Sequence, residues 1–81
     1  MKMYYKIVIR PFDTSADLYI RGTLEGHAVG GETYILDIDM SRDQVEMHLR
    51  QTADNVEVVE IPQAEFELLS RQKLRFFAPN P

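Results

Sequence analysis

Residues 25–39 read EGHAVGGETYILDID, and the way in which this stretch turns decides the fold. Its second half alternates apolar and polar residues, so Tyr34, Leu36 and Ile38 would share the inward face of a strand. The glycines could instead cradle a phosphate, but their spacing matches neither the P-loop nor the dinucleotide-binding fingerprint. The stretch therefore predicts a hairpin rather than a nucleotide site.

The register of this hairpin follows from the position of its charged residues. A two-residue turn would pair Leu24 with Asp37 and place a carboxylate on the apolar face. A three-residue loop over residues 29–31 pairs Leu24 with Leu36 instead, and gives Gly31 the left-handed backbone that such loops need. We therefore predict the three-residue loop.

The remaining elements alternate between strands and helices. Ser41 and Gln44 form a capping box at the start of one helix, and Pro62 suits the first turn of another. This order, β-β-β-α-β-α-β, indicates an α+β fold with a largely antiparallel sheet and two helices. The predicted elements are strands over residues 3–9, 18–28, 32–40 and 56–61, helices over 41–53 and 62–72, and a short strand or extended segment over 73–77, in a single domain over 1–78 with a tail at 79–81.

The composition is that of a small globular domain. The 81 residues, 44% of them hydrophobic and 27% charged, are enough for one domain with a small core. The chain has no cysteine, which excludes disulfides and thiolate metal sites. Charged residues near the start argue against a signal peptide, and no apolar run reaches the roughly 20 residues of a membrane span. We expect a cytoplasmic protein without membrane contacts.

The titratable residues give little support for catalysis. Asp37 and Asp39 would share one strand face, as Mg²⁺ ligands can, but Arg21 on the neighbouring strand would neutralise Asp39. His27 near a loop and His48 on the inner face of a helix lack the spacing of a zinc site. No serine lies in a nucleophile motif. We predict that the protein is not an enzyme and uses no metal and no cofactor.

The net charge of −4 is unevenly distributed along the chain. Residues 25–67 carry eleven acidic side chains against two arginines, whereas both ends of the chain are basic. An anionic surface can dock on a basic groove of a partner protein and raise the association rate, or it can simply keep a small protein soluble. The predicted partner-binding residues are Asp37, Asp39, Asp43, Glu46, Glu57 and Glu60.

A second surface offers an alternative function. Tyr4 and Lys6 on the first strand, with Tyr19 and Arg21 on the second, would interleave aromatic and basic side chains on the outer face of the sheet. Such a face can stack nucleic-acid bases and hold phosphates. The negative net charge and the absence of an RNP motif weigh against this interpretation.

In size, acidity, lack of cysteine and absence of catalytic motifs, the chain is similar to small phage-encoded inhibitors such as anti-CRISPR and anti-restriction proteins. This similarity concerns composition and assigns no role to any residue. With the acidic middle of the chain, it implies a non-catalytic module that inhibits a partner by covering a basic surface, such as that of a nucleic-acid-binding protein. Nucleic-acid binding through Tyr4, Lys6, Tyr19 and Arg21 is the alternative.

Overall fold

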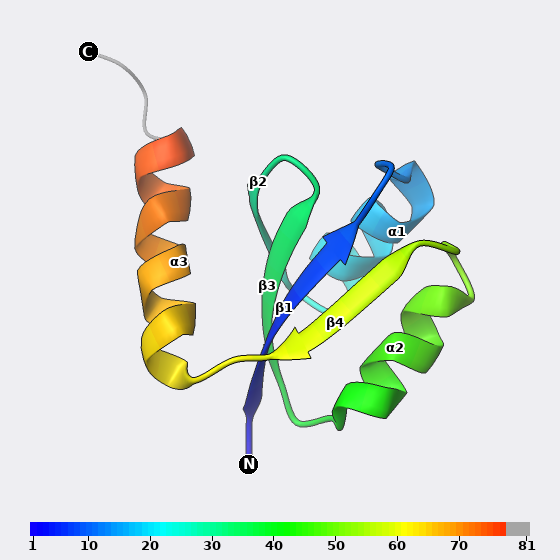
Figure 1. Ribbon diagram of the computed structural model, residues 1–81, viewed down its shortest axis with the longest axis horizontal. Helices are drawn as coiled ribbons and strands as arrows, with labels where there is room; N and C mark the ends of the chain where they lie inside the picture. The colour runs from blue at the N-terminus through cyan, green and yellow to red at the C-terminus, as the bar shows by residue number, and fades with distance from the viewer. Residues whose placement is uncertain (78–81) are drawn as a thin grey trace.

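A computed structural model describes the backbone of residues 1–77 and the side chains of residues 1–72. In this part of the chain, four strands form one antiparallel sheet in the order β2-β3-β1-β4, and three helices and a π-helical turn pack on it (Figure 1). The α+β class predicted from the sequence is thus confirmed. The elements are β1 (Met3–Ile9), α1 (Thr14–Leu18), the π-helical turn η1 (Tyr19–Thr23), β2 (His27–Gly30), β3 (Thr33–Ile38), α2 (Arg42–Arg50), β4 (Val56–Glu60) and α3 (Gln63–Phe77).

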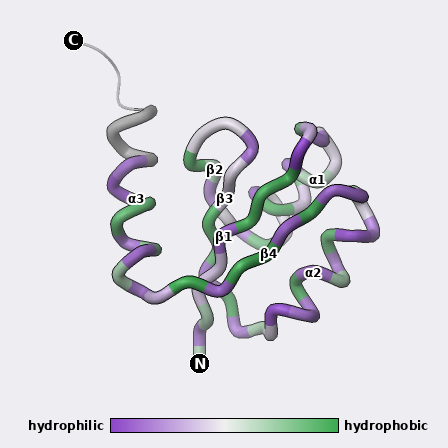
Figure 2. Tube along the Cα trace, in the orientation of Figure 1, coloured by the Kyte–Doolittle hydropathy of each residue, from purple (hydrophilic) through white to green (hydrophobic). Residues whose placement is uncertain are grey.

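The central strand β1 organises the core. It pairs antiparallel with β3 on one side and with β4 on the other. Tyr5, Ile7 and Ile9 are buried on one face, as the alternating sequence predicts. Hydrophobic residues follow β1 and β4, whereas α2 is mostly hydrophilic (Figure 2). The main core joins these three side chains to Ala16, Ile20, Leu24, Tyr34, Leu36, Val45, Leu49, Ala53, Val56 and Val58.

The two faces of the sheet carry different helices. In Figure 1, α1, η1 and α2 lie on the core side of the sheet, and α3 lies on the opposite side. α3 packs on β2, β1 and β3. The centroid of the Phe66 ring lies 5.0 Å from that of Tyr4, and Ile35 is completely buried on this side. The outer face of β1 is therefore partly covered by a helix.

The prediction of a second strand over residues 18–28 is wrong for most of its length. This segment begins in α1, continues through η1 and joins the sheet only at β2. Ala16, Ile20 and Leu24 are buried at intervals of four residues, whereas Leu18, which was expected to face inward, is 60% exposed. A four-residue interval places side chains on one face of a helix, and this period prevails over the strand-like composition.

The β2–β3 hairpin contains the expected left-handed glycine but not the expected register. Gly31 has a φ of +57° and lies in a two-residue turn between the strands. Ala28 pairs with Tyr34, and a bulge follows this pair. The predicted pairing of Leu24 with Leu36 is wrong, because Leu24 lies at the end of η1, before the strand begins.

We expect Gly31→Ala to lower the free energy of unfolding by about 1 kcal/mol. No atom lies within 4 Å of a Cβ built at Gly31, so the left-handed backbone is the source of the cost. Gly22→Ala is the matched control, because Gly22 is equally open and does not have a positive φ. Urea denaturation measures both variants, and equal stability of the two would contradict the expectation.

The helix α2 begins with the capping box that the sequence predicts. The Gln44 amide donates to the Ser41 hydroxyl at 3.3 Å, and the Ser41 amide donates to the Gln44 side chain at 3.2 Å. Val45 and Leu49 are fully buried, and His48 beside them is half-buried. The cap and this apolar face fix which side of α2 meets solvent.

Two arginines of α2 bind the free edge of β4. The backbone N–H and C=O groups of successive residues point to opposite sides of a strand. In β4, those of the even-numbered residues point away from β1, toward the free edge of the sheet. The Arg42 Nε donates to the Val58 carbonyl at 2.8 Å, and the Arg50 Nη2 donates to the Val56 carbonyl at 3.3 Å. The carbonyl groups of Val56 and Val58 are thereby paired within the chain, and these hydrogen bonds connect α2 to the sheet.

The last predicted strand, over residues 73–77, is wrong. α3 runs from Gln63 to Phe77 and includes this segment. The helix begins at Gln63, one residue later than predicted, and no glycine or proline follows Pro62 in the sequence before Pro79. The chain therefore has three helices instead of two, and four strands instead of five, in the residues described. The predicted boundary at residue 78 and the tail over 79–81 lie outside these residues.

Candidate functional site

Two of the predicted acidic residues are neutralised by the start of the chain. The Asp37 carboxylate lies 3.5 Å from the Lys2 ammonium group, and that of Asp39 lies 3.6 Å from the N-terminal ammonium group. The predicted cross-strand pair of Arg21 with Asp39 is wrong, because Arg21 lies in η1 and pairs with Asp17. Each of these two carboxylates therefore faces a positive group of the same chain, in an ion pair that is exposed to solvent.

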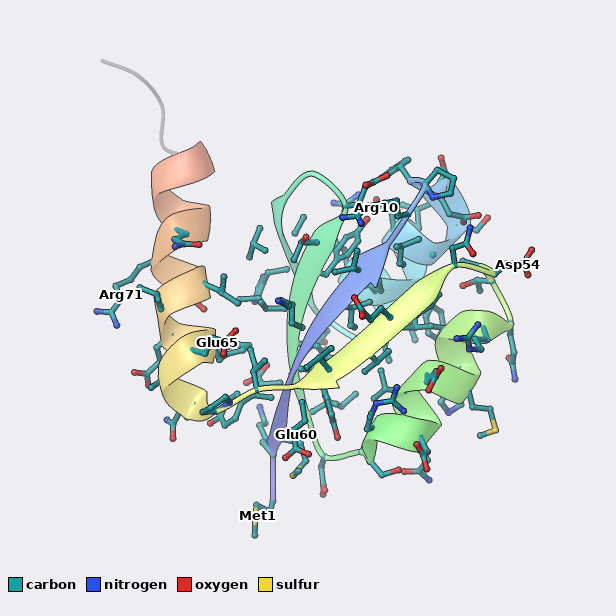
Figure 3. The ribbon with its side chains drawn as sticks, in the orientation of Figure 1. Met1, Arg10, Asp54, Glu60, Glu65 and Arg71 are labelled. Atoms are coloured by element: carbon teal, nitrogen blue, oxygen red, sulfur yellow. The ribbon has the colours of Figure 1, made fainter. Side chains whose placement is uncertain are left out.

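The two predicted residues of β4 lie on opposite faces of the sheet. The buried valines of β4 face the core, so by alternation Glu57 lies on the side of α3 and Glu60 on the side of α2. Figure 3 shows Glu60 close to Met1 and far from Arg10 and Asp54, which lie toward the other end of the sheet. The six acidic residues thus do not form one continuous surface.

Asp43 and Glu46 do come together, on the solvent side of α2. They border an open hollow of about 430 Å³. Its lining residues recur every three or four positions, which places them on one helix face. Met47, at the middle of this face, is 56% exposed. We call this face the α2 stripe, and it consists of Asp43, Glu46, Met47, Arg50 and Gln51.

The Glu46 carboxylate of the α2 stripe is ionised and held in place. Glu46 accepts hydrogen bonds from Arg42 at 2.8 Å and from Arg50 at 2.9 Å. The Arg50 hydrogen bond is the main reason that the pKa of Glu46 is lowered. Asp43 accepts one bond, from Arg42 at 3.2 Å, and its side chain is otherwise open to solvent. Both arginines also donate to backbone carbonyls, so the stripe presents carboxylate acceptors beside an apolar side chain.

The alternative nucleic-acid residues lie on two sides of the sheet. Tyr4 and Lys6 belong to the face of β1 that α3 partly covers, and Tyr4 packs on Phe66. Tyr19 and Arg21 belong to η1, on the opposite side of the sheet. The structure therefore does not assemble these four side chains into one stacking surface.

A cleft that the sequence analysis does not anticipate opens between η1 and the β2–β3 hairpin. Its volume is about 500 Å³. In Figure 1, α1 and the β2–β3 hairpin lie at the end of the molecule opposite to the N-terminus. The lining residues of the cleft are Phe12, Asp17, Arg21, His27, Ala28, Gly31 and Tyr34.

The floor of the cleft is a buried carboxylate with three donors. The Asp17 residue is 8% exposed. The Arg21 Nε lies 3.1 Å and Nη2 lies 2.6 Å from Asp17 Oδ2, and the Tyr34 hydroxyl donates to Oδ1 at 2.7 Å. This network joins Asp17 of α1 and Arg21 of η1 to Tyr34 of β3. No buried polar side-chain atom of the described residues lacks a hydrogen-bond partner.

The network keeps each of its members in one protonation state. The hydrogen bond from Arg21 is the largest effect on Asp17 and lowers the pKa of its carboxyl. Burial raises the pKa of Tyr34, and the hydrogen bond to Asp17 raises it further. Asp17 therefore accepts and Tyr34 donates throughout the neutral pH range.

One sequence signal could have revealed half of this network. Asp17 and Arg21 are four residues apart, which is the spacing of an ion pair on a helix. Asp13 is a helix cap in front of them, since its side chain accepts from the Ala16 amide at 2.9 Å. Tyr34 carries no comparable signal, because its contact with Asp17 depends on how the hairpin folds over η1.

The described residues contain no group of three or more His, Cys, Asp or Glu placed to hold a metal ion. No helix in this part of the chain is both long and apolar enough to cross a membrane.

Comparison of the chain with protein-family models, with curated proteins and with solved structures gives no match.

Proposed function

We propose that the protein is a non-catalytic module that binds a partner protein with a basic surface, and that the α2 stripe makes the contact. The observation that carries this proposal is Met47, an exposed apolar side chain on the same helix face as Asp43 and Glu46. Methionine is enriched in interface cores and adapts its shape to the surface that it meets. The Asp43 carboxylate on the same face, whose side chain is 94% exposed, would favour a basic partner.

The stripe is suited to binding because it is held rigidly. Arg42 and Arg50 connect Glu46 to the edge of β4, so the helix and its carboxylates are ordered before a partner arrives. An ordered surface loses less conformational entropy on binding. Such a module would inhibit a nucleic-acid-binding protein by covering its basic groove, in keeping with the similarity in composition to phage-encoded inhibitors.

The test is affinity capture from a lysate with immobilised protein, followed by mass spectrometry. We expect a basic protein to be recovered by the wild type and lost with Asp43→Lys and with Met47→Glu. Glu57→Lys is the matched control, because it reverses the same charge on the other face of the sheet. Equal recovery by all variants, or by none, would contradict the proposal.

The kinetics of the captured complex separate the two contributions. We expect Asp43→Lys to slow association, most strongly at low salt, because exposed charges are screened beyond about 8 Å at physiological ionic strength. We expect Met47→Ala to speed dissociation by about tenfold, since apolar contacts act on the residence time. Surface plasmon resonance at two salt concentrations measures both rates. An unchanged dissociation rate would remove Met47 from the interface.

A further inference from the structure

The segment that forms one wall of the cleft combines several costly features. η1 is a π-helical turn, closed by a hydrogen bond from the Leu24 amide to the Tyr19 carbonyl at 3.0 Å. Glu25 directly after it has a φ of +59°, which is uncommon outside glycine. The same segment buries the charged carboxylate of Asp17. Such features cost stability and concentrate at functional sites.

The guanidinium group of Arg21 has one edge engaged and one edge available. Asp17 takes the edge formed by Nε and Nη2. No described residue accepts a hydrogen bond from Nη1, and the side chain is 50% exposed where it lines the cleft. A guanidinium presents five N–H donors, so the Nη1–Nη2 edge can still form a bidentate pair with a planar carboxylate.

The rest of the cleft is apolar enough to hold the body of a ligand. Phe12, a residue that is 54% exposed, lines it, and Ala28 lies on β2 at the hairpin wall. The volume of about 500 Å³ is within the range of small-molecule sites. An exposed phenylalanine beside an arginine edge matches a molecule that has one apolar part and one anionic part.

We propose that this cleft binds a small organic carboxylate with an apolar body. The carboxylate meets the Nη1–Nη2 edge of Arg21, and the body packs on Phe12. The charge on the floor of the cleft favours this class of anion: any anion at the Arg21 edge is repelled by the Asp17 carboxylate, and this repulsion is about twice as large for a dianionic phosphate as for a singly charged carboxylate. The site is separate from the α2 stripe, so each can fail without the other.

The experiment is a titration of the ¹⁵N-labelled full chain, followed by amide NMR. The probes are benzoate, its neutral analogue benzamide, and phenyl phosphate. We expect benzoate to give saturable shifts at residues 12, 27–31 and 34, with a Kd near about 1 mM. Benzamide should give no saturable shifts at these residues, and phenyl phosphate should bind at least about fivefold more weakly than benzoate.

Two variants test the two halves of the site. We expect Phe12→Ala to weaken benzoate binding about fivefold, while Leu18→Ala, an equally exposed apolar position outside the cleft lining, leaves it unchanged. Arg21→Lys keeps a positive charge for Asp17 but removes the planar fork, and should weaken binding at least about tenfold with the fold retained. Three results would overturn the proposal. The first is that the amide shifts do not saturate up to about 20 mM benzoate, and the second is that benzamide or phenyl phosphate binds as tightly as benzoate. The third is that Phe12→Ala and Leu18→Ala bind benzoate with equal affinity.

Discussion

Replacing Asp17 with alanine is expected to lower the free energy of unfolding by about 3 kcal/mol. The buried Tyr34 hydroxyl would lose its acceptor, and Arg21 would lose the partner that holds it against η1. Because the Arg21 side chain is half exposed and water can replace part of the lost contact, the cost falls at the lower end of the range for broken buried ion pairs. Urea denaturation followed by circular dichroism measures the change.

The control for this variant is Asp54→Ala, which removes an exposed carboxylate without an ion pair to a described residue. We expect it to change the stability by less than about 0.5 kcal/mol. A loss of less than about 1 kcal/mol in Asp17→Ala would show that the network contributes little to the fold.

The contribution of Asp17 is also expected to disappear in acid. The hydrogen bond from Arg21 holds the pKa of Asp17 below its ordinary value of 3.8. A carboxyl whose pKa is lowered by folding stabilises the protein above its ordinary pKa, and this effect is lost as the pH falls through the folded-state pKa. The difference in Tm between the wild type and Asp17→Asn should therefore be constant near neutral pH and shrink below about pH 4. A difference that persists unchanged to about pH 2 would mean that the charge is not its source.

The substitution Gly26→Ala is expected to cost about 2 kcal/mol. A Cβ at this buried position would lie 2.8 Å from Ile20 Cγ2 and 3.1 Å from the Ile35 carbonyl oxygen. The Cγ2 methyl is bonded directly to the Cβ of a β-branched side chain, so it cannot rotate away without moving Ile20 out of the core. The Gly26 amide also donates to the Ile20 carbonyl at 2.8 Å, which holds the two segments together.

Gly22→Ala again serves as the control, because nothing lies within 4 Å of its Cβ. The two variants add the same methyl group four residues apart, so their difference in unfolding free energy isolates the clash. Thermal and urea denaturation should agree on a loss in Gly26→Ala alone. Equal stabilities would show that η1 can move away from β3 at no cost.

The parts of the fold that the sequence predicts correctly are those with one dominant local signal. β1 has strict alternation, and α2 has a complete capping box at Ser41 and Gln44. Residues 14–24 carry two competing signals, a β-rich composition and a four-residue interval between Ala16, Ile20 and Leu24. The interval prevails because it buries these three side chains together, and burial of an apolar face outweighs intrinsic propensity.

The candidate sites are less accessible to sequence reasoning than the fold. Asp43 and Glu46 could be placed on one surface, since the helix that carries them is well signalled. Met47 directly follows Glu46 in sequence, but its exposure depends on which side of α2 the core occupies. The cleft depends on tertiary packing throughout, because Tyr34 and Asp17 come from elements that meet only when the hairpin closes over η1.

The arginines that brace β4 also determine whether the sheet can grow. Open sheets end in strands that can recruit another chain, and repeated recruitment produces fibres. At β4, an incoming strand must displace Arg42 and Arg50 from the edge carbonyls and so loosen α2 as well. At the opposite edge, β2 offers four residues interrupted by a bulge. Neither edge of the sheet is therefore a good template for an incoming strand.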